Sequence, residues 1–210
     1  MEIYKGIRLP LHEREVAKWI IDNADGVCVD VGAGTGVHTK IMAQIPRVWR
    51  VYAFEPIPYN AEKIRSLKHP KIRVFQIALG KEEGTLRLYD KNVNKSTDFE
   101  WVNATAIVSD EAIGHHYDTY IDVPMKPLNK IIRRADFIKI DVEGMEYDVI
   151  LGAKGVYENA KMVIELHGWG NYDMEEFLSL LRETHIIVNE VPEKITVWHI
   201  FLIPRERSRG

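Results

Sequence analysis

The sequence predicts an α/β fold in which a mostly parallel sheet is covered by helices on both faces. Predominantly apolar runs at residues 27–31, 48–54 and 72–79 are typical of buried strands, and segments with helical periodicity lie between them. This alternation requires crossover connections, which favour parallel strands. A glycine-rich turn follows the first run directly, and such turns bring backbone N–H groups close to a ligand.

The composition indicates one domain and excludes several classes of protein. A chain of 210 residues can bury one substantial core, and its net charge of −3 argues against a nucleic-acid partner. The single cysteine, Cys28, excludes an internal disulfide and a multi-cysteine zinc site. No apolar stretch is long enough to span a bilayer and no signal-peptide core is visible, so we expect a cytoplasmic protein without a membrane partner. The oligomeric state stays open, with a homodimer as one option.

The first half of the chain is expected to alternate strands and helices after an N-terminal arm. Residues 1–10 carry no clear pattern, whereas residues 11–22 have apolar positions on one side of a helix. The same spacing predicts helices at 37–45 and 58–68, and Pro58 suits a first helical turn. The strand predicted at 72–79 ends at Gly80.

An irregular stretch then interrupts the alternation. Residues 84–89 alternate like an exposed strand, and residues 104–108 are expected to pair back with them as a hairpin. We treat residues 90–124 as an insertion between the third and fourth strands of the sheet, where a substrate wall is expected.

Regular structure is predicted again from residue 127 onwards. A short helix at 127–134 precedes a strand at 137–141, and the helical segment 145–160 is broken at Gly152 and Gly155. A strand at 162–167 is followed by a helix that Asp173 can cap. The last two strands are expected at 186–188 and 196–203.

The spacing of the glycines narrows the class of ligand. A dinucleotide fingerprint requires Gly-x-Gly-x-x-Gly, but here the third glycine, Gly36, comes one residue early, which argues against a nicotinamide oxidoreductase. Gly-x-Gly-x-Gly with an acid, Asp30, two residues before Gly32 resembles motif I of class I S-adenosylmethionine-dependent methyltransferases. In that interpretation the turn passes close to the methionine part of the cofactor. The alternative is that the glycines only form a tight turn.

A second acid follows the second predicted strand. Glu55, before Pro56, is placed to accept hydrogen bonds from both ribose hydroxyls of a nucleoside. The alternative is a solvated glutamate at the start of a helix.

Four blocks of sequence resemble the FkbM family of methyltransferases. The most specific is the block Asp136-Phe-Ile-Lys-Ile-Asp141-Val-Glu143-Gly-Met-Glu146, and the others lie at 53–56, 78–80 and 163–167. They occur in the family's order and span about residues 25–170. Two departures are visible: Asn129 stands where the family has Asp, and the glycine turn lacks the common Ala-Asn-x-Gly.

The resemblance implies a single Rossmann-like domain with a seven-stranded sheet of order 3-2-1-4-5-7-6, in which strand seven is antiparallel. It also implies S-adenosyl-L-methionine as cofactor and methyl transfer to a hydroxyl of a small molecule or sugar-like (glycan) acceptor. We accordingly divide the domain 1–210 into parts: an N-terminal arm and helix (1–24), a cofactor-binding half (25–89), the insertion (90–124), the second half of the sheet (125–204) and a flexible tail (205–210).

The resemblance and the strand ends together nominate the site residues. The expected cofactor-binding residues are Asp30, Gly32, Ala33, Gly34, Gly36, Glu55, Pro56, Ala78 and Asp141. The expected catalytic residues, which can remove a proton from the acceptor, are Asp141, Glu143, Glu165 and His167. Three of them have a simpler alternative: Asp141 holding the cofactor's amino group or fixing the loop, Glu143 starting a helix, and His167 being structural. Lys139 can pair with a buried acid.

Other functions remain open at this point. The O and N groups of the catalytic set could hold a Mg²⁺-like ion, but no spacing requires one, so we expect no metal. Methylation of RNA or protein is the alternative enzyme activity, and the absence of a basic appended domain argues against it. A nucleoside-binding module without catalysis is the alternative outside enzymes.

Overall fold

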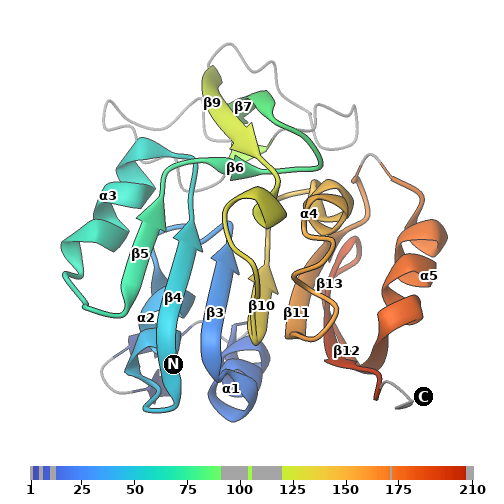
Figure 1. Cartoon of the computed structure of the whole chain (residues 1–210), viewed down its shortest axis with the longest axis horizontal. Helices are drawn as coiled ribbons and strands as arrows, with labels where there is room; N and C mark the ends of the chain where they lie inside the picture. The colour runs from blue at the N-terminus through green and yellow to red at the C-terminus, as the bar shows by residue number, and fades with distance from the viewer. Residues whose placement is uncertain are drawn as a thin grey trace.

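A seven-stranded sheet forms the centre of the molecule, with strand order β5-β4-β3-β10-β11-β13-β12 (Figure 1). The computed structural model describes residues 2–4, 7–9, 13–90, 104–105, 120–170 and 172–206. β13 runs antiparallel to both of its neighbours, β11 and β12, whereas all other neighbouring strands of this sheet are parallel. The order and the antiparallel seventh strand are therefore confirmed. The strands are β3 (Gly26–Val31), β4 (Val48–Phe54), β5 (Ile72–Phe75), β10 (Phe137–Ile140), β11 (Lys161–His167), β12 (His185–Lys194) and β13 (Val197–Pro204).

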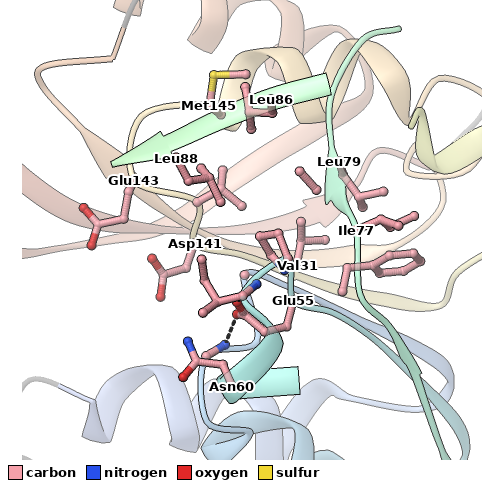
Figure 2. Close-up of a pocket in the computed structure, with 17 residues that line it drawn as sticks. Val31, Glu55, Asn60, Ile77, Leu79, Leu86, Leu88, Asp141, Glu143 and Met145 are labelled. Atoms are coloured by element: carbon pink, nitrogen blue, oxygen red, sulfur yellow. Dashed lines mark hydrogen bonds between the residues drawn. The ribbon is translucent and has the colours of Figure 1, made fainter. Parts of the chain in front are cut away.

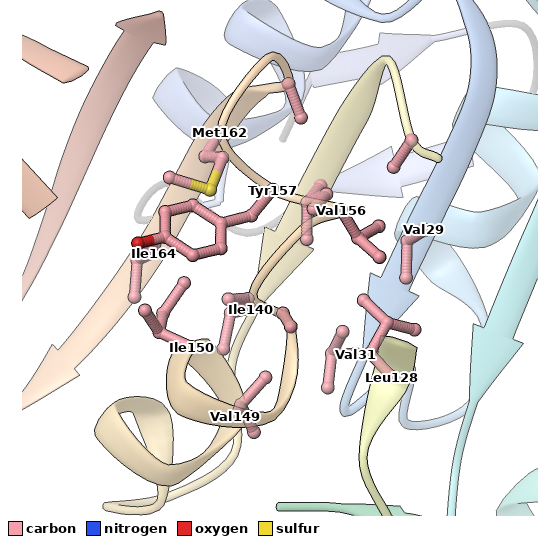
Figure 3. Close-up of a cluster of buried hydrophobic side chains, with 14 of the residues drawn as sticks. Val29, Val31, Leu128, Ile140, Val149, Ile150, Val156, Tyr157, Met162 and Ile164 are labelled. Atoms are coloured by element: carbon pink, nitrogen blue, oxygen red, sulfur yellow. The ribbon is translucent and has the colours of Figure 1, made fainter. Parts of the chain in front are cut away.

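Helices cover both faces of this sheet because successive residues of its inner strands point to opposite sides. On one face, α1 (Arg14–Asn23), α2 (Val37–Gln44) and α3 (Pro58–Ser66) pack around Cys28 and Phe137. On the other face, η1 (Leu128–Lys130), α4 (Glu146–Gly152) and α5 (Met174–Thr184) pack against residues such as Val29 and Ile140 (Figure 3). The predicted buried position of Cys28 is confirmed.

A second sheet, of order β6-β9-β7-β8, lies over the carboxyl ends of β3, β4 and β5 (Figure 1). Its strands are β6 (Ala78–Leu79), β7 (Gly84–Asp90), β8 (Ala104–Thr105) and β9 (Tyr120–Lys126). The predicted pairing of 104–108 with 84–89 is confirmed where it is described, at Tyr89–Thr105. Of the insertion expected at 90–124, residues 91–103 and 106–119 lie outside the described part of the chain.

The prediction of one strand over residues 72–79 is wrong. The chain leaves the central sheet after Phe75 and enters the second sheet at Ala78, which pairs with Met125 of β9. The second sheet therefore begins before residue 90, and β9 within it was not predicted as a strand. Along β9, exposed residues alternate with Ile121, Val123 and Met125, of which Val123 is fully buried, and Pro124 within this short pattern argued against a strand.

Smaller differences concern element ends. Residues 1–10, which carried no prediction, include a two-stranded antiparallel pair, β1 (Glu2–Tyr4) and β2 (Ile7–Leu9). The helix predicted at 127–134 is only the 3-10 turn η1. The helix expected within 145–160 ends at Gly152, where a side chain would overlap the carbonyl oxygen of Gly80. Asp173 caps α5 as predicted, since its Oδ1 accepts the N–H of Glu176 at 2.8 Å. None of the helices in the described ranges is long and apolar enough to cross a membrane.

Candidate active site

A cleft with an empty volume of about 790 Å³, which includes space open to solvent, lies between the carboxyl ends of the central strands and the second sheet. Glu55, Asp141 and Glu143 supply its acids, and Leu86 and Leu88 of β7 supply part of its apolar wall. Figure 2 shows Asp141 and Glu143 on one side and Ile77 and Leu79 on the other. The cleft is thus acidic at one end and apolar at the other.

Glu55 is fixed by backbone N–H groups from both sides of it in the chain. Its Oε2 accepts the N–H of Gly34 at 2.7 Å, and its Oε1 accepts the N–H of Ile57 at 2.9 Å (Figure 2). Burial raises the pKa of Glu55 to about 7, although these hydrogen bonds favour the charged form. The side chain of Asn60 is a third partner of this carboxyl group, whose two oxygens offer about four acceptor positions in all, so acceptor capacity remains for a ligand hydroxyl.

The three glycines of the turn serve different purposes. All three have positive φ, but a side chain at Gly32 would overlap the carbonyl oxygen of Asp141. A Cβ at Gly36 would lie 2.9 Å from Cγ1 of Ile64 on α3. A Cβ at Gly34 would have nothing within 4 Å. Gly34 is therefore the glycine that borders open space, while the other two allow close packing.

The predicted cofactor-binding residues do not all reach the cleft. Those that line it are Gly32, Gly34, Glu55, Pro56, Ala78 and Asp141; those outside its lining are Asp30, Ala33 and Gly36. Asp30 is fully buried, and its Oδ2 accepts the hydroxyl of Thr39 on α2 at 2.5 Å. Asp30 thus joins β3 to α2 beneath the turn.

Lys139 links the acids of neighbouring strands, and its predicted pairing with a buried acid is confirmed. Its Nζ donates to Oδ2 of Asp141 at 3.0 Å and lies 3.8 Å from Oδ1 of Asp30. Burial alone lowers the pKa of a lysine, but the charges of Asp141 and Asp30 outweigh it and raise the pKa of Lys139. Lys139 is therefore a fixed positive charge behind the cleft.

His167 lies behind the acidic end of the cleft, buried between carboxylates. Its Nδ1 is 2.9 Å from Oε1 of Glu146, and its Nε2 is 3.3 Å from Oε1 of Glu165 and 3.5 Å from Oε2 of Glu143. Burial lowers the pKa of a histidine, but the hydrogen bonds with Glu146 and Glu165 raise that of His167 to about 10. Without a further cation, His167 is protonated at neutral pH and cannot accept another proton.

Sequence reasoning did not identify Glu146 as a site residue. This side chain is fully buried; its Oε1 also accepts the N–H of Gly144 at 2.8 Å, and its Oε2 accepts the hydroxyl of Tyr172 at 2.8 Å. The turn that it holds has positive φ at Glu143 (56°) and Gly144 (104°). The sequence could have indicated Glu146 as a site residue, because it ends the most specific block of the family resemblance.

His199 of β13 is the second residue that was missed. It pairs in register with Glu165 of β11, and its Nε2 lies 2.9 Å from Oε2 of that carboxylate. Burial raises the pKa of a carboxyl group, but the hydrogen bonds with His167 and His199 outweigh it and lower the pKa of Glu165.

The carboxyl group of Asp141 shifts in the opposite direction. Burial, together with the negative charges of Glu165 and Glu143, raises the pKa of Asp141 although the charge of Lys139 lowers it.

The structure brings the four predicted catalytic residues into one cluster. Asp141 and Glu143 line the cleft, whereas Glu165 and His167 lie behind them. One ligand atom each of Asp141, Glu165 and His167 lies within 4.8 Å of the others. Such a cluster can take up a proton from a bound hydroxyl or hold a cation.

Comparisons with known proteins give one consistent result. The family model described as the methyltransferase FkbM domain matches residues 30–185. The 2-O-methyltransferase NoeI of Sinorhizobium fredii (strain NBRC 101917 / NGR234) is 25% identical over 189 residues, which cover 77% of this chain and 72% of NoeI.

Two solved structures share the fold. Methyltransferase FkbM from Methylobacillus flagellatus KT superposes with a TM-score of 0.55 at 16% identity, over 86% of this chain. This chain spans only 44% of that protein's length. TrmK of M. capricolum, in complex with S-adenosyl-homocysteine, superposes with a TM-score of 0.51 at 12% identity, over 95% of this chain and 70% of that one. At these identities the two structures show a class I methyltransferase fold and nothing more specific.

Proposed function

Since this chain belongs to the FkbM methyltransferase domain family, we propose that it transfers the methyl group of S-adenosylmethionine to a hydroxyl of a small-molecule or glycan acceptor. The observation that carries this proposal is the cleft itself, with Glu55 and Gly34 at its floor and Asp141 and Glu143 at its acidic end. The name of NoeI, a 2-O-methyltransferase, supports an oxygen acceptor.

The residues of the cleft fit this cofactor. The carboxylate of Glu55, oriented by two backbone N–H groups, can accept both ribose hydroxyls. Ile77 and Leu79 offer an apolar surface to a base, and the open space next to Gly34 allows close approach. Asp141 can accept hydrogen bonds from an amino group. Bound here, S-adenosylmethionine supplies a methyl group on a positively charged sulfur, and breaking that carbon–sulfur bond releases an uncharged thioether.

Glu143 is the residue best placed to take the proton from the acceptor. Its carboxylate lines the cleft and its side chain is 25% exposed, so it can exchange a proton with water. Oδ2 of Asp141 accepts a hydrogen bond from Lys139, and His167 lies outside the lining of the cleft, where its Nε2 faces Glu165 and Glu143. As the acceptor oxygen forms its bond to the methyl carbon, Glu143 accepts the hydroxyl proton, and the protein otherwise acts by alignment.

The test is formation of S-adenosylhomocysteine in the presence of pooled hydroxylated acceptors, including sugars and short glycans, measured by mass spectrometry. We expect product that depends on the acceptor pool and carries the added methyl group on oxygen. The Glu62→Ala variant is the control, because this acid of α3 has a side chain 73% exposed and lies outside the lining of the cleft. Binding of S-adenosylhomocysteine without turnover of any acceptor class would favour a nucleoside-binding module.

A further inference from the structure

Three side chains at the acidic end of the cleft converge in the manner of metal ligands. Asp141 follows β10, and Glu165 and His167 lie two residues apart on β11, so they share one face of that strand. One ligand atom from each lies within 4.8 Å of the others. His167 is 2% exposed, so its Nε2 is held in a fixed direction inside the protein.

Each of these three side chains is also held by an outer partner through its other polar atom. Nδ1 of His167 lies 2.9 Å from Glu146, Oε2 of Glu165 lies 2.9 Å from Nε2 of His199, and Oδ2 of Asp141 accepts from Lys139 at 3.0 Å. Outer partners of this kind, above all a carboxylate on the second nitrogen of a histidine, orient metal ligands in proteins. Nε2 of His167 and Oε1 of Glu165 face each other at 3.3 Å, and a carboxylate oxygen of Asp141 lies within 4.8 Å of the ligand atoms of both residues.

The distances within the cluster suit a shared cation better than direct hydrogen bonds. Nε2 of His167 is 3.3 Å from Glu165 and 3.5 Å from Glu143. Charge-assisted hydrogen bonds are shorter, about 2.7–2.9 Å. Ligand atoms that bind one cation at roughly 2.1 Å lie about 3.0–3.5 Å apart, and the 3.3 Å between Nε2 of His167 and Oε1 of Glu165 falls in this range.

The net charge of the cluster also favours a bound cation. Leaving Glu143 aside, the ion pairs described join four carboxylates, those of Asp30, Asp141, Glu146 and Glu165, to three cationic groups, those of Lys139, His167 and His199. The cluster is therefore negative even when both histidines are protonated. Buried charges are normally compensated by a partner or a metal ion.

We propose that Asp141, Glu165 and His167 bind one divalent cation at the edge of the cleft. Two carboxylate oxygens and a single imidazole nitrogen favour an ion of the Mg²⁺ or Mn²⁺ type, whose remaining positions hold water or a substrate oxygen. The cation replaces the proton on Nε2 of His167.

The role of this ion rests on the proposed function, whereas its binding does not. Placed beside Asp141 and Glu143 of the cleft, the cation binds the acceptor hydroxyl and lowers its pKa, and Glu143 then accepts the proton. The ion thereby selects acceptors with an exposed hydroxyl that can reach the acidic end.

The experiment is titration of Mn²⁺ into chelator-treated protein, with and without S-adenosylhomocysteine, followed by electron paramagnetic resonance of free Mn²⁺. We expect one saturable site, and Asp141→Asn and Glu165→Gln should each weaken it by at least about tenfold. Glu193→Gln is the matched control, because Glu193 forms a second acidic group with Glu165 and His199. This variant should bind Mn²⁺ normally.

A spin-echo measurement on the unmodified protein avoids dependence on how the variants fold. Bound Mn²⁺ should show coupling to one imidazole nitrogen, which His167→Gln removes. Three results would overturn the proposal: no saturable binding up to about 1 mM Mn²⁺, the weak end of protein cation sites; no nitrogen coupling; or loss of binding in Glu193→Gln but not in Asp141→Asn. Binding of Mn²⁺ in a protein that fails to bind S-adenosylhomocysteine would refute the proposed function and leave the cation site standing.

Discussion

The two ends of the cleft hold their carboxylates in different ways. Glu55 is fixed by the backbone N–H groups of Gly34 and Ile57, and no charged side chain forms a hydrogen bond with it among those described. Glu165, behind Asp141 and Glu143 of the acidic end, is fixed by the side chains of His167 and His199, both of which can carry charge. Backbone donors fix a carboxylate without neutralising it and suit binding, whereas titratable partners suit proton and cation chemistry.

The largest expected effect comes from removing the acid that faces the acceptor. Glu143→Gln should lower kcat by roughly 10²–10⁴-fold, the usual contribution of general-base catalysis. The affinity for S-adenosylhomocysteine should be unchanged, because Glu55 lies at the other end of the cleft. Steady-state kinetics with the identified acceptor and calorimetry with S-adenosylhomocysteine measure the two quantities. Near-normal kcat in alanine variants of Asp141, Glu143, Glu165 and His167 would mean that the enzyme works by alignment alone.

The next effect is a pH dependence of stability that comes from Glu55. The pKa of Glu55 rises from 4.5 to about 7 on folding, because the carboxyl group becomes buried. As the pH rises, the unfolded chain loses this proton before the folded protein does. The contribution of Glu55 to the free energy of unfolding is therefore complete below about pH 4.5 and is lost as the pH rises through 7. Relative to Glu55→Gln, the unmodified protein should lose about 3 kcal/mol of unfolding free energy between pH 4.5 and 8. Urea unfolding at a series of pH values checks this, and parallel curves for the two proteins would show that burial does not perturb Glu55.

A smaller effect is expected on cofactor affinity. Glu55→Ala removes the acceptor for the ribose hydroxyls and should weaken binding of S-adenosylhomocysteine by about 1.5–3 kcal/mol. Calorimetric titration measures it, with Glu62→Ala as the exposed control on α3. Unchanged affinity in Glu55→Ala would place the ribose elsewhere.

The smallest effect on stability separates two glycines of the same turn. Gly34→Ala introduces a side chain at φ +54° with nothing within 4 Å, so it should cost only about 1–2 kcal/mol of stability. It should nevertheless weaken cofactor binding, because its Cβ enters the cleft.

Gly32→Ala is the matched variant, since its Cβ would overlap the carbonyl oxygen of Asp141. It should lower the melting temperature clearly more than Gly34→Ala does. Equal melting temperatures of the two variants would contradict the packing role of Gly32. Normal cofactor affinity in Gly34→Ala would contradict the role of Gly34 in leaving room for the cofactor.

The same contrast explains which features could be predicted. Glu55 and Gly34 belong to local patterns, a strand end and a glycine turn, which the sequence displays directly. The contact between Glu165 and His199 depends on the register of β11 against β13, which no local pattern encodes. The structural role of Glu146 depends on Tyr172 and His167, which lie 26 and 21 residues away.

The errors in the fold have a similar physical origin. Where the chain leaves β5 within residues 72–79, only Gln76 interrupts the apolar residues, and a single polar residue is also common inside a strand, so the departure to β6 was not predicted. Strand β9 was not predicted from the sequence, and most of its residues are exposed. Asp30 and Gly36, which were assigned to the cofactor by position in a motif, lie outside the lining of the cleft; Asp30 accepts a hydrogen bond from Thr39, and a side chain at Gly36 would meet Ile64. Packing between distant segments decides such cases.

A crystal structure with S-adenosylhomocysteine tests most directly whether Glu55 binds the ribose and whether methyl transfer takes place at the end of Asp141 and Glu143. We expect both ribose hydroxyls on the carboxylate of Glu55 and the sulfur directed toward the end lined by Asp141 and Glu143. A ribose bound away from Glu55, or a sulfur directed toward Ile77 and Leu79 instead of toward these acids, would contradict it.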